Sequence, residues 1–121
     1  MGITYIEGKV EGPTGKKSDI RFLVDSGATY SLLPKKIWES IDLKEKRKMS
    51  FSLVDGTSVE RGVSEAYLVL KEGEAHTPVI LGEKEDEALL GVVTLEIMGL
   101  VFIAGGVTSL PLWHHTVYRL F

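Results

Sequence analysis

One short segment of the sequence carries residue types that could do acid–base chemistry. Asp25 directly follows the apolar run Phe22–Val24 and precedes Ser26 and Gly27. Such a run predicts a strand, so the carboxylate would lie at a strand end on a sharp turn, where it can take or give a proton. The same residue types also favour an ordinary Asx turn, because Asp, Ser and Gly all stabilise turns for local reasons. The segment alone leaves both interpretations open.

Other sequence motifs with a known chemical mechanism do not occur. The sequence has no Gly-Lys-Ser/Thr phosphate loop, no Gly-x-Gly-x-x-Gly, no His-Glu-x-x-His and no Gly-x-Ser-x-Gly. Without Cys there is no thiolate nucleophile, disulfide or Cys-ligated zinc. His76, His114 and His115 do not make a metal motif, because adjacent His side chains diverge along a strand. We therefore expect neither a metal nor a cofactor.

The chain around Asp25 is predicted to consist mainly of short strands. Alternating apolar positions, β-branched and aromatic side chains and bounding turn residues identify these strands. They are residues 3–10, a run through Ile20, Phe22 and Val24, then Met49–Val54, Thr57–Val63, Tyr67–Leu70 and Thr77–Leu81, with strand-like sequence again after Gly99. Short strands in this number predict a mainly β fold with a small closed or highly curved sheet.

Two short helices and several turns separate the strands. Pro34–Ile41 predicts a helix, since Pro suits a first helical turn, and Val92–Met98 predicts another, which a following Gly ends. The dipeptide Asp55-Gly56 is the one that best accepts the positive φ angles of a tight hairpin turn, so this hairpin should project. The mixed charges of Lys44–Lys48 indicate a solvated connection.

Length and composition indicate one globular domain, residues 1–121, with 44% apolar and 26% charged residues. A chain of this length can bury a core without disulfides. The net charge of −3 argues against a nucleic-acid partner. Trp38 and Trp113 are accordingly expected in the core or an interface. The most apolar stretch, Leu89–Val107, contains Glu96 and several Gly, so we expect no membrane span; the N-terminus has no secretory pattern, so we expect a cytoplasmic protein.

The sequence contains neither Asn nor Gln. These amides are chemically labile at high temperature, and their depletion is typical of heat-adapted proteins. We therefore expect a thermophilic source.

Three features, in order along the chain, resemble the retropepsin-like aspartic proteases. The catalytic loop of that family reads two apolar residues, Asp, Thr or Ser, Gly, Ala, then Ser, Thr or Asp, and Leu23–Thr29 matches it at every position. A second signature, two apolar residues and Gly before a short helix, is matched by Leu89, Leu90 and Gly91. Asp55-Gly56 lies between them, where the family has the turn of its flap hairpin. The resemblance covers residues 3 to about 103 and implies a small closed β-barrel with a flap.

This resemblance implies a peptidase that needs two copies of the chain. Members of the family cleave peptide bonds with two Asp carboxylates that hold a water and share one proton, because like charges about 3 Å apart cannot both ionise. The sequence contains one such motif, with Asp25 as the catalytic residue. The second carboxylate must therefore come from a second copy, in a two-fold symmetric homodimer acting on a peptide or unfolded protein.

Neighbouring residues acquire expected roles from the family's pattern. A flap tip around residues 54–57 would close over a bound peptide and exclude water. Ser26 would brace the two loops across the dimer axis. The residues expected to contact substrate are Gly27, Thr29, Val54, Asp55 and Gly56, and those expected to support the catalytic loop are Ser26, Gly27, Ala28, Leu90 and Gly91.

The end of the chain departs from the family. Residues 104–121 do not align with the terminal interface strand that family members often have, although their apolar side chains make them a candidate interface. The alternative function is a protease-like fold that dimerises or binds peptides without turnover. An intact Asp25 favours catalysis, because an unpaired acid at a dimer axis costs stability.

Overall fold

The computed structural model describes residues 3–25, 27–103 and 106–109. Within these ranges the chain forms nine strands and two short helices. In chain order they are β1 (Tyr5–Glu11), β2 (Lys17–Val24), β3 (Ser31–Leu33), α1 (Lys35–Ser40), β4 (Arg47–Ser52), β5 (Ser58–Leu70), β6 (Glu74–Leu81), β7 (Leu89–Leu90), α2 (Val92–Ile97), β8 (Leu100–Ile103) and β9 (Gly106–Ser109).

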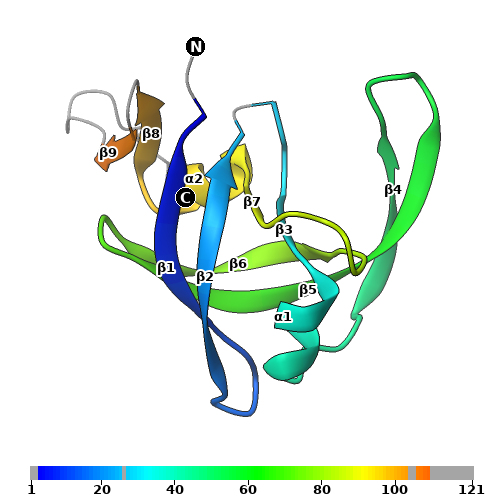
Figure 1. Cartoon of the computed structure of the whole chain (residues 1–121), viewed down its shortest axis with the longest axis horizontal. Helices are drawn as coiled ribbons and strands as arrows, with labels where there is room; N and C mark the ends of the chain where they lie inside the picture. The colour runs from blue at the N-terminus through cyan, green and yellow to red at the C-terminus, as the bar shows by residue number, and fades with distance from the viewer. Residues whose placement is uncertain (1–2, 26, 104–105, 110–121) are drawn as a thin grey trace, which may run out of the picture.

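Six strands pair into a ring (Figure 1). Their order is β1-β2-β7-β3-β6-β5, and β5 pairs back onto β1 through Tyr67–Leu70. β4 lies outside the ring, where it pairs with the first half of β5. The predicted mainly β fold with a small closed sheet is confirmed.

Apolar side chains from every strand of the ring form the core. β2 shows why, since its alternate residues Ile20, Phe22 and Val24 are buried while the preceding Asp19 and the intervening Arg21 are exposed. Fully burying a side chain of this kind stabilises the fold by about 1.5–3 kcal/mol. β2 is therefore anchored up to its last residue, immediately before Asp25.

The structure corrects one predicted break in the chain. Thr57–Val63 and Tyr67–Leu70 were expected as two strands, but both belong to β5, which runs for 13 residues. The strand changes partner without ending, because Val63 pairs with Arg47 on β4 and also with Ile80 on β6. One strand thus belongs both to the ring and to the projecting hairpin.

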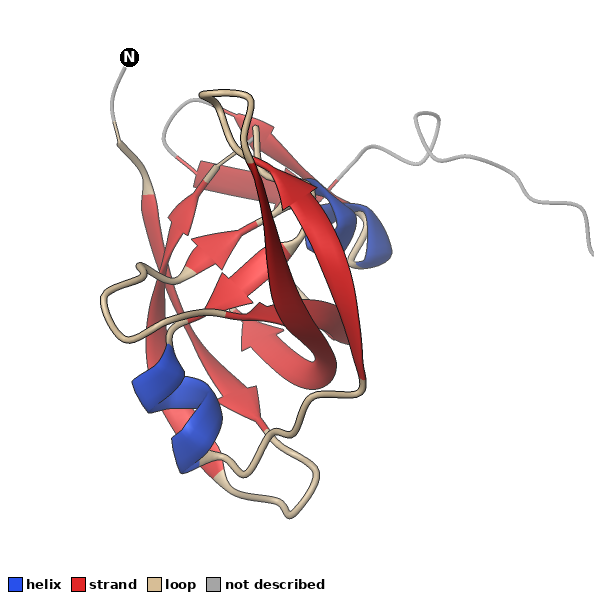
Figure 2. Cartoon of the chain, turned by 90° about the vertical axis from the view of Figure 1, so that its right-hand side faces the viewer, coloured by secondary structure: helices blue, strands red, loops and turns tan. Residues whose placement is uncertain are grey.

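Both helices occur where the sequence predicts them, at opposite ends of the strands (Figure 2). Pro34 precedes α1, and Gly99, with φ of 70°, follows the end of α2. Trp38 packs against the core, as predicted, and its ring N–H donates to the Gly82 carbonyl at 2.8 Å. The charged connection after α1 is shorter than expected, because β4 already begins at Arg47.

The strand-like sequence after Gly99 forms the separate antiparallel pair β8–β9. The rest of the tail, with Trp113, His114 and His115, lies outside the described residues. None of the helices in the described ranges has the length and apolar character needed to cross a membrane.

Candidate active site

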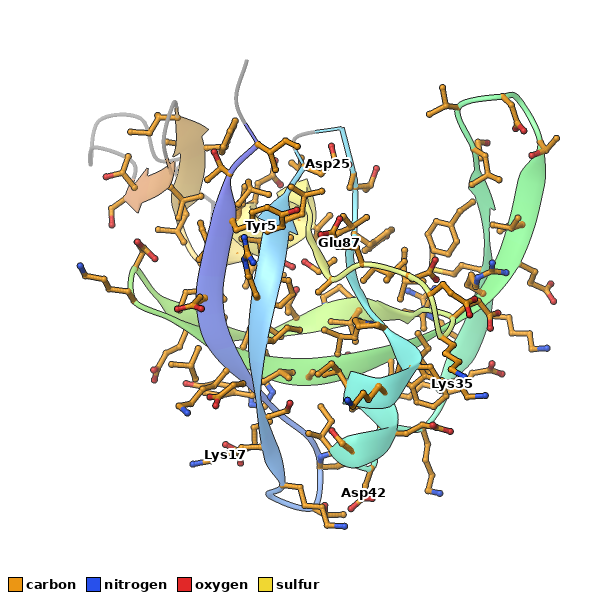
Figure 3. The ribbon with its side chains drawn as sticks, viewed as in Figure 1. Tyr5, Lys17, Asp25, Lys35, Asp42 and Glu87 are labelled. Carbon is orange, nitrogen blue, oxygen red and sulfur yellow. The ribbon has the colours of Figure 1, made fainter. Side chains whose placement is uncertain are left out.

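Asp25 lies at the end of β2, on the same side of the ring as the tip of the β4–β5 hairpin (Figure 3). Leu23 and Val24 pair in parallel with Leu89 and Leu90 of β7. The Asp25 N–H then donates to the Leu90 carbonyl at 3.3 Å. The two short sequence signatures therefore meet, and the half-buried carboxylate stands just beyond the strand pair.

The loop after Asp25 fixes the orientation of its carboxylate. Oδ1 accepts the Gly27 N–H at 2.9 Å, and the Asp25 carbonyl accepts the Ala28 N–H at 3.0 Å. The first bond is that of an Asx turn. The two interpretations of this segment, a local turn and an acid held in a fixed orientation, are therefore compatible. A Cβ on Gly27 would lie 3.2 Å from Oδ1, a tight contact that Gly avoids. Ser26 lies outside the described residues.

The start of α2 holds the other side of this loop. Val92 N–H donates to the Ala28 carbonyl and Val93 N–H to the Thr29 carbonyl, both at 2.9 Å. These amides are free to do so because the first turn of a helix has no internal acceptors for them. Leu90 is fully buried and Thr29 is exposed beside the loop. The chain from β7 into α2 therefore supports residues 25–29.

Gly91, between β7 and α2, allows this close approach. A Cβ there would lie 2.5 Å from the Tyr30 carbonyl carbon and 2.9 Å from the Ser31 nitrogen. Real Cβ atoms do not come this close to a backbone, so only Gly fits without a shift. The signature Leu89-Leu90-Gly91 thus has a direct steric reason.

Three buried hydroxyl side chains below the loop were not predicted from the sequence. Ser31, Thr77 and Thr94 are 0%, 1% and 0% exposed. The Ser31 and Thr94 oxygens are 2.6 Å apart, those of Thr77 and Thr94 are 2.8 Å apart, and Gly91 N–H donates to Ser31 Oγ at 3.0 Å. The one signal in the sequence was a Thr inside the apolar helical run Val92–Ile97.

The β4–β5 hairpin projects from the ring as the sequence predicts, but its turn is of another type. Leu53 accepts the Gly56 N–H at 3.0 Å and donates its own N–H to Thr57 at 2.7 Å. Gly56 has φ of 88°, whereas Asp55 does not have a positive φ. The loop therefore has three residues with a left-handed Gly at the end, not two residues with positive φ.

The side chain of Asp55 stabilises this tip. Its Oδ1 accepts the Thr57 hydroxyl at 2.6 Å and the Thr57 N–H at 3.0 Å, and these bonds lower the pKa of the Asp55 carboxyl. Val54 stands fully in solvent at the tip. Toward the tip of the hairpin, where Phe51 pairs with Val59, the rings of Phe51 and Tyr30 meet edge to face, 6.0 Å apart. Neither aromatic residue was predicted as a site residue.

A polar cluster ties the start of the ring to the segment before β7. The Tyr5 hydroxyl donates to Glu87 at 3.1 Å, and the Arg21 guanidinium lies 3.9 Å from the centre of the Tyr5 ring. The bond to Glu87 raises the pKa of Tyr5. Tyr5 pairs with Leu23 of β2, two residues before Asp25, and Figure 3 labels all three charged or hydroxyl-bearing residues Tyr5, Glu87 and Asp25.

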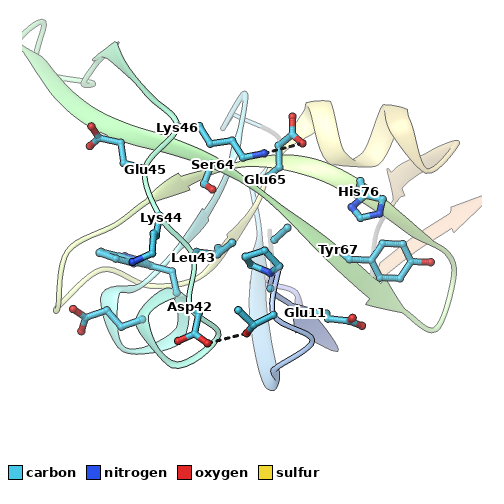
Figure 4. Close-up of a pocket in the computed structure, with 16 residues that line it drawn as sticks. Glu11, Asp42, Leu43, Lys44, Glu45, Lys46, Ser64, Glu65, Tyr67 and His76 are labelled. Atoms are coloured by element: carbon cyan, nitrogen blue, oxygen red, sulfur yellow. Dashed lines mark hydrogen bonds and ion pairs between the residues drawn. The ribbon is translucent and has the colours of Figure 1, made fainter.

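A groove of about 1120 Å³ lies elsewhere on the molecule (Figure 4). It is bounded by the end of α1, the turn near Gly12 and β5–β6, and contains Tyr67 and His76, whose rings meet edge to face. No predicted site residue lines it. In the ranges that the structure describes, no three His, Asp or Glu side chains gather in a geometry that could hold a metal.

Comparisons with known proteins agree with this geometry. A family model described as aspartyl protease matches residues 6–94. The fold is similar to EIAV protease in complex with the inhibitor HBY-793, with a TM-score of 0.64, 17% identity, and coverage of 84% of this chain and 93% of that chain. It is also similar to a retropepsin-like aspartic protease from Rickettsia conorii, with a TM-score of 0.53, 23% identity and 88% of each chain covered. A search of curated protein sequences finds no match. These likenesses identify the fold as retropepsin-like.

Proposed function

The chain belongs to the aspartyl protease family, and on this premise we propose that it is a homodimeric aspartic endopeptidase. The observation that carries the proposal is the Asp25 carboxylate, half-buried at a strand end and oriented by the Gly27 amide. One chain contributes one such carboxylate, so a complete site needs a second copy across a two-fold axis.

In the proposed reaction, one Asp25 carboxylate accepts a proton from a water held between the pair. The water oxygen attacks the peptide carbonyl, and the protonated Asp25 of the other copy donates its proton to the carbonyl oxygen. A pair that shares one proton supplies both a base and an acid. As the tetrahedral intermediate breaks down, the first Asp25 gives its newly acquired proton to the amide nitrogen and the C–N bond breaks. A hydroxyl of the intermediate returns a proton to the second Asp25 as the carboxyl product forms, so the pair again shares one proton.

The proposed substrate is a peptide or an unfolded protein segment in extended conformation. It would lie between the loop at residues 27–29 and the flap tip at residues 54–56, where exposed backbone can pair with it. The exposed tip, with Val54 wholly in solvent, supports a hairpin that closes over the substrate. Closure would order the peptide and exclude water other than the reacting one.

The test is the substitution Asp25→Asn, with cleavage of a peptide library, circular dichroism and sedimentation measured on both proteins. The amide keeps the shape of the side chain and removes the base, so cleavage should disappear while the fold and the dimer persist. A statine-type transition-state mimic should inhibit the unsubstituted protein.

Two outcomes would contradict the proposal. A monomer at concentrations that support cleavage would exclude a site shared between copies, and cleavage that survives Asp25→Asn would place the chemistry elsewhere. A stable dimer that binds peptides without cleaving them would favour the alternative, a non-catalytic peptide-binding or dimerisation module.

A further inference from the structure

The three buried hydroxyls of Ser31, Thr94 and Thr77 connect three elements below the Asp25 loop. Ser31 begins β3, Thr94 lies in α2 and Thr77 lies in β6. Buried side chains usually donate and accept hydrogen bonds with the nearest backbone, whereas these contact one another at 2.6 and 2.8 Å. None of them reaches the reacting carboxylate, so the proposed chemistry does not use them directly.

One direction of hydrogen bonding uses every proton in this group. The Gly91 N–H can only donate, and it donates to Ser31 Oγ. At the other end the Thr77 hydroxyl donates to the Pro78 carbonyl at 3.4 Å. Ser31 then donates to Thr94 and Thr94 to Thr77. The bonds run head to tail from Gly91 to Pro78, an arrangement in which each bond polarises the next.

This chain of bonds, the hydroxyl relay, ends at the segment that holds the catalytic loop. Gly91 follows Leu90, whose carbonyl accepts the Asp25 N–H, and precedes Val92, whose N–H donates to Ala28. The position of the loop therefore depends on where β7 and the start of α2 sit. The hydroxyl relay fixes β7 and the start of α2 relative to β3 and β6, and its three residues are buried away from water.

We propose that Ser31, Thr94 and Thr77 are positioning residues. They fix the place of the Asp25 loop relative to β3 and β6, so that the two carboxylates of the dimer meet in reacting geometry. This inference rests on the proposed function. A misplacement of about 1 Å in such a site can reduce the rate about 100-fold. Removing one relay hydroxyl should accordingly lower kcat much more than it changes KM.

The decisive comparison uses two substitutions at one position. Thr94→Val keeps the shape and removes the hydroxyl, so the protein should stay folded and lose about 10- to 100-fold in kcat, with KM changed by about 2-fold or less. Thr94→Ser keeps the hydroxyl and loses a methyl group, so it should retain kcat although its thermal midpoint falls. A purely structural role would instead make activity follow stability in both variants.

A matched control is Ser64→Ala, because Ser64 is also buried, at 2% exposure, and takes no part in the relay. It should leave kcat unchanged. Full kcat in Thr94→Val, or equal losses in Thr94→Val and Thr94→Ser, would overturn the proposal.

Amide hydrogen exchange tests the same inference without catalysis. Thr94→Val should speed exchange at the Asp25, Gly91 and Val92 amides by about 10-fold or more through local opening, while Thr94→Ser and Ser64→Ala should not. Unchanged exchange at these amides in Thr94→Val would overturn the relay. If the three variants show this exchange pattern but the unsubstituted protein cleaves no peptide, only the proposed function is contradicted.

Discussion

Gly91 gives the sharpest prediction at the scale of a single residue. Its Cβ position lies 2.5 Å from the Tyr30 carbonyl carbon, which is backbone and cannot rotate away. Gly91→Ala should therefore destabilise the protein by about 2 kcal/mol or more, since overpacking of a filled interior typically costs 1–3 kcal/mol. Urea unfolding at equal protein concentration measures the effect.

Gly106→Ala is the control for this substitution. Its added Cβ meets no atom of the described residues within 4 Å, and its φ is not in the left-handed region. We expect a change within about 0.5 kcal/mol, as for most surface substitutions. Equal destabilisation by both substitutions would show that steric contact at Gly91 is not the cause.

The residues of the candidate site differ in how far the sequence predicts them. Asp25, Gly27 and Gly91 belong to short motifs whose residue types follow from turn geometry and close approach, so they are readable from the sequence. Ser31 and Thr77 contact Thr94 from positions 63 and 17 residues away. Such contacts depend on which strands become neighbours, and a polar residue inside an apolar run does not reveal its partner.

At the scale of the elements, the flap hairpin should respond to pH through Asp55. The Thr57 hydroxyl and N–H hold the pKa of the Asp55 carboxyl below that of an ordinary Asp side chain. A lowered pKa in the folded hairpin means that this stabilisation is present above the unfolded pKa and is lost as the pH falls through the folded pKa. The carboxyl shift of Asp55 and the amide shift of Thr57, followed by NMR, should titrate together with a midpoint below that of an ordinary Asp side chain.

Thr57→Val separates the two bonds of this turn. It removes the hydroxyl donor, which is the largest cause of the shift, and keeps the backbone donor. The midpoint should then rise toward that of an ordinary Asp while remaining below it. A midpoint that does not change would mean that the hydroxyl bond is absent in solution.

The Tyr30–Phe51 contact predicts how the flap is coupled to the loop. Phe51 on β4 meets Tyr30 beside the loop, and such aromatic pairs contribute about 0.5–1.5 kcal/mol beyond their buried area. Phe51→Leu keeps an apolar side chain and removes the ring contact. On the proposed function it should raise KM by about 2- to 10-fold, as expected for that energy, with a smaller change in kcat.

Most elements could be predicted, because apolar periodicity and turn residues act locally. The helix boundaries follow from Pro34 and Gly99, and the flap turn follows from Asp55-Gly56. The break predicted between Val63 and Tyr67 was wrong, because a strand continues wherever new partners are available on its edge. The turn type was also wrong, since a single left-handed Gly is enough for a three-residue loop.

At the scale of the whole molecule, the missing Asn and Gln suggest heat adaptation. Ion pairs on the surface are consistent with this, since three of the six among the described residues join neighbouring strands, such as Lys9 with Asp19 and Lys48 with Glu60. Exposed pairs of this kind contribute little at room temperature and relatively more when hot. We expect a thermal midpoint above about 65 °C, the upper end for ordinary mesophilic domains. Calorimetry showing a lower midpoint would contradict the hypothesis.

The proposed dimer should be linked to pH through its two acids. Two ionised Asp25 side chains brought together at the axis repel each other, whereas a pair that shares one proton does not. Protons are therefore bound more tightly in the dimer than in separate chains. By linkage, this contribution to association is present at low pH and is lost as the pH rises and the shared proton leaves.

Asp25→Asn isolates this contribution from every other titrating group of the interface, because the substitution leaves those groups unchanged. The dimer dissociation constant of the unsubstituted protein should rise between mildly acidic and alkaline pH by more than that of the Asn variant. Sedimentation equilibrium across that range measures both. Identical pH dependence in the two proteins would refute the shared proton. A carboxylate pair that shares no proton does not supply a base and an acid at the same time. The non-catalytic module would then be the better account of the dimer.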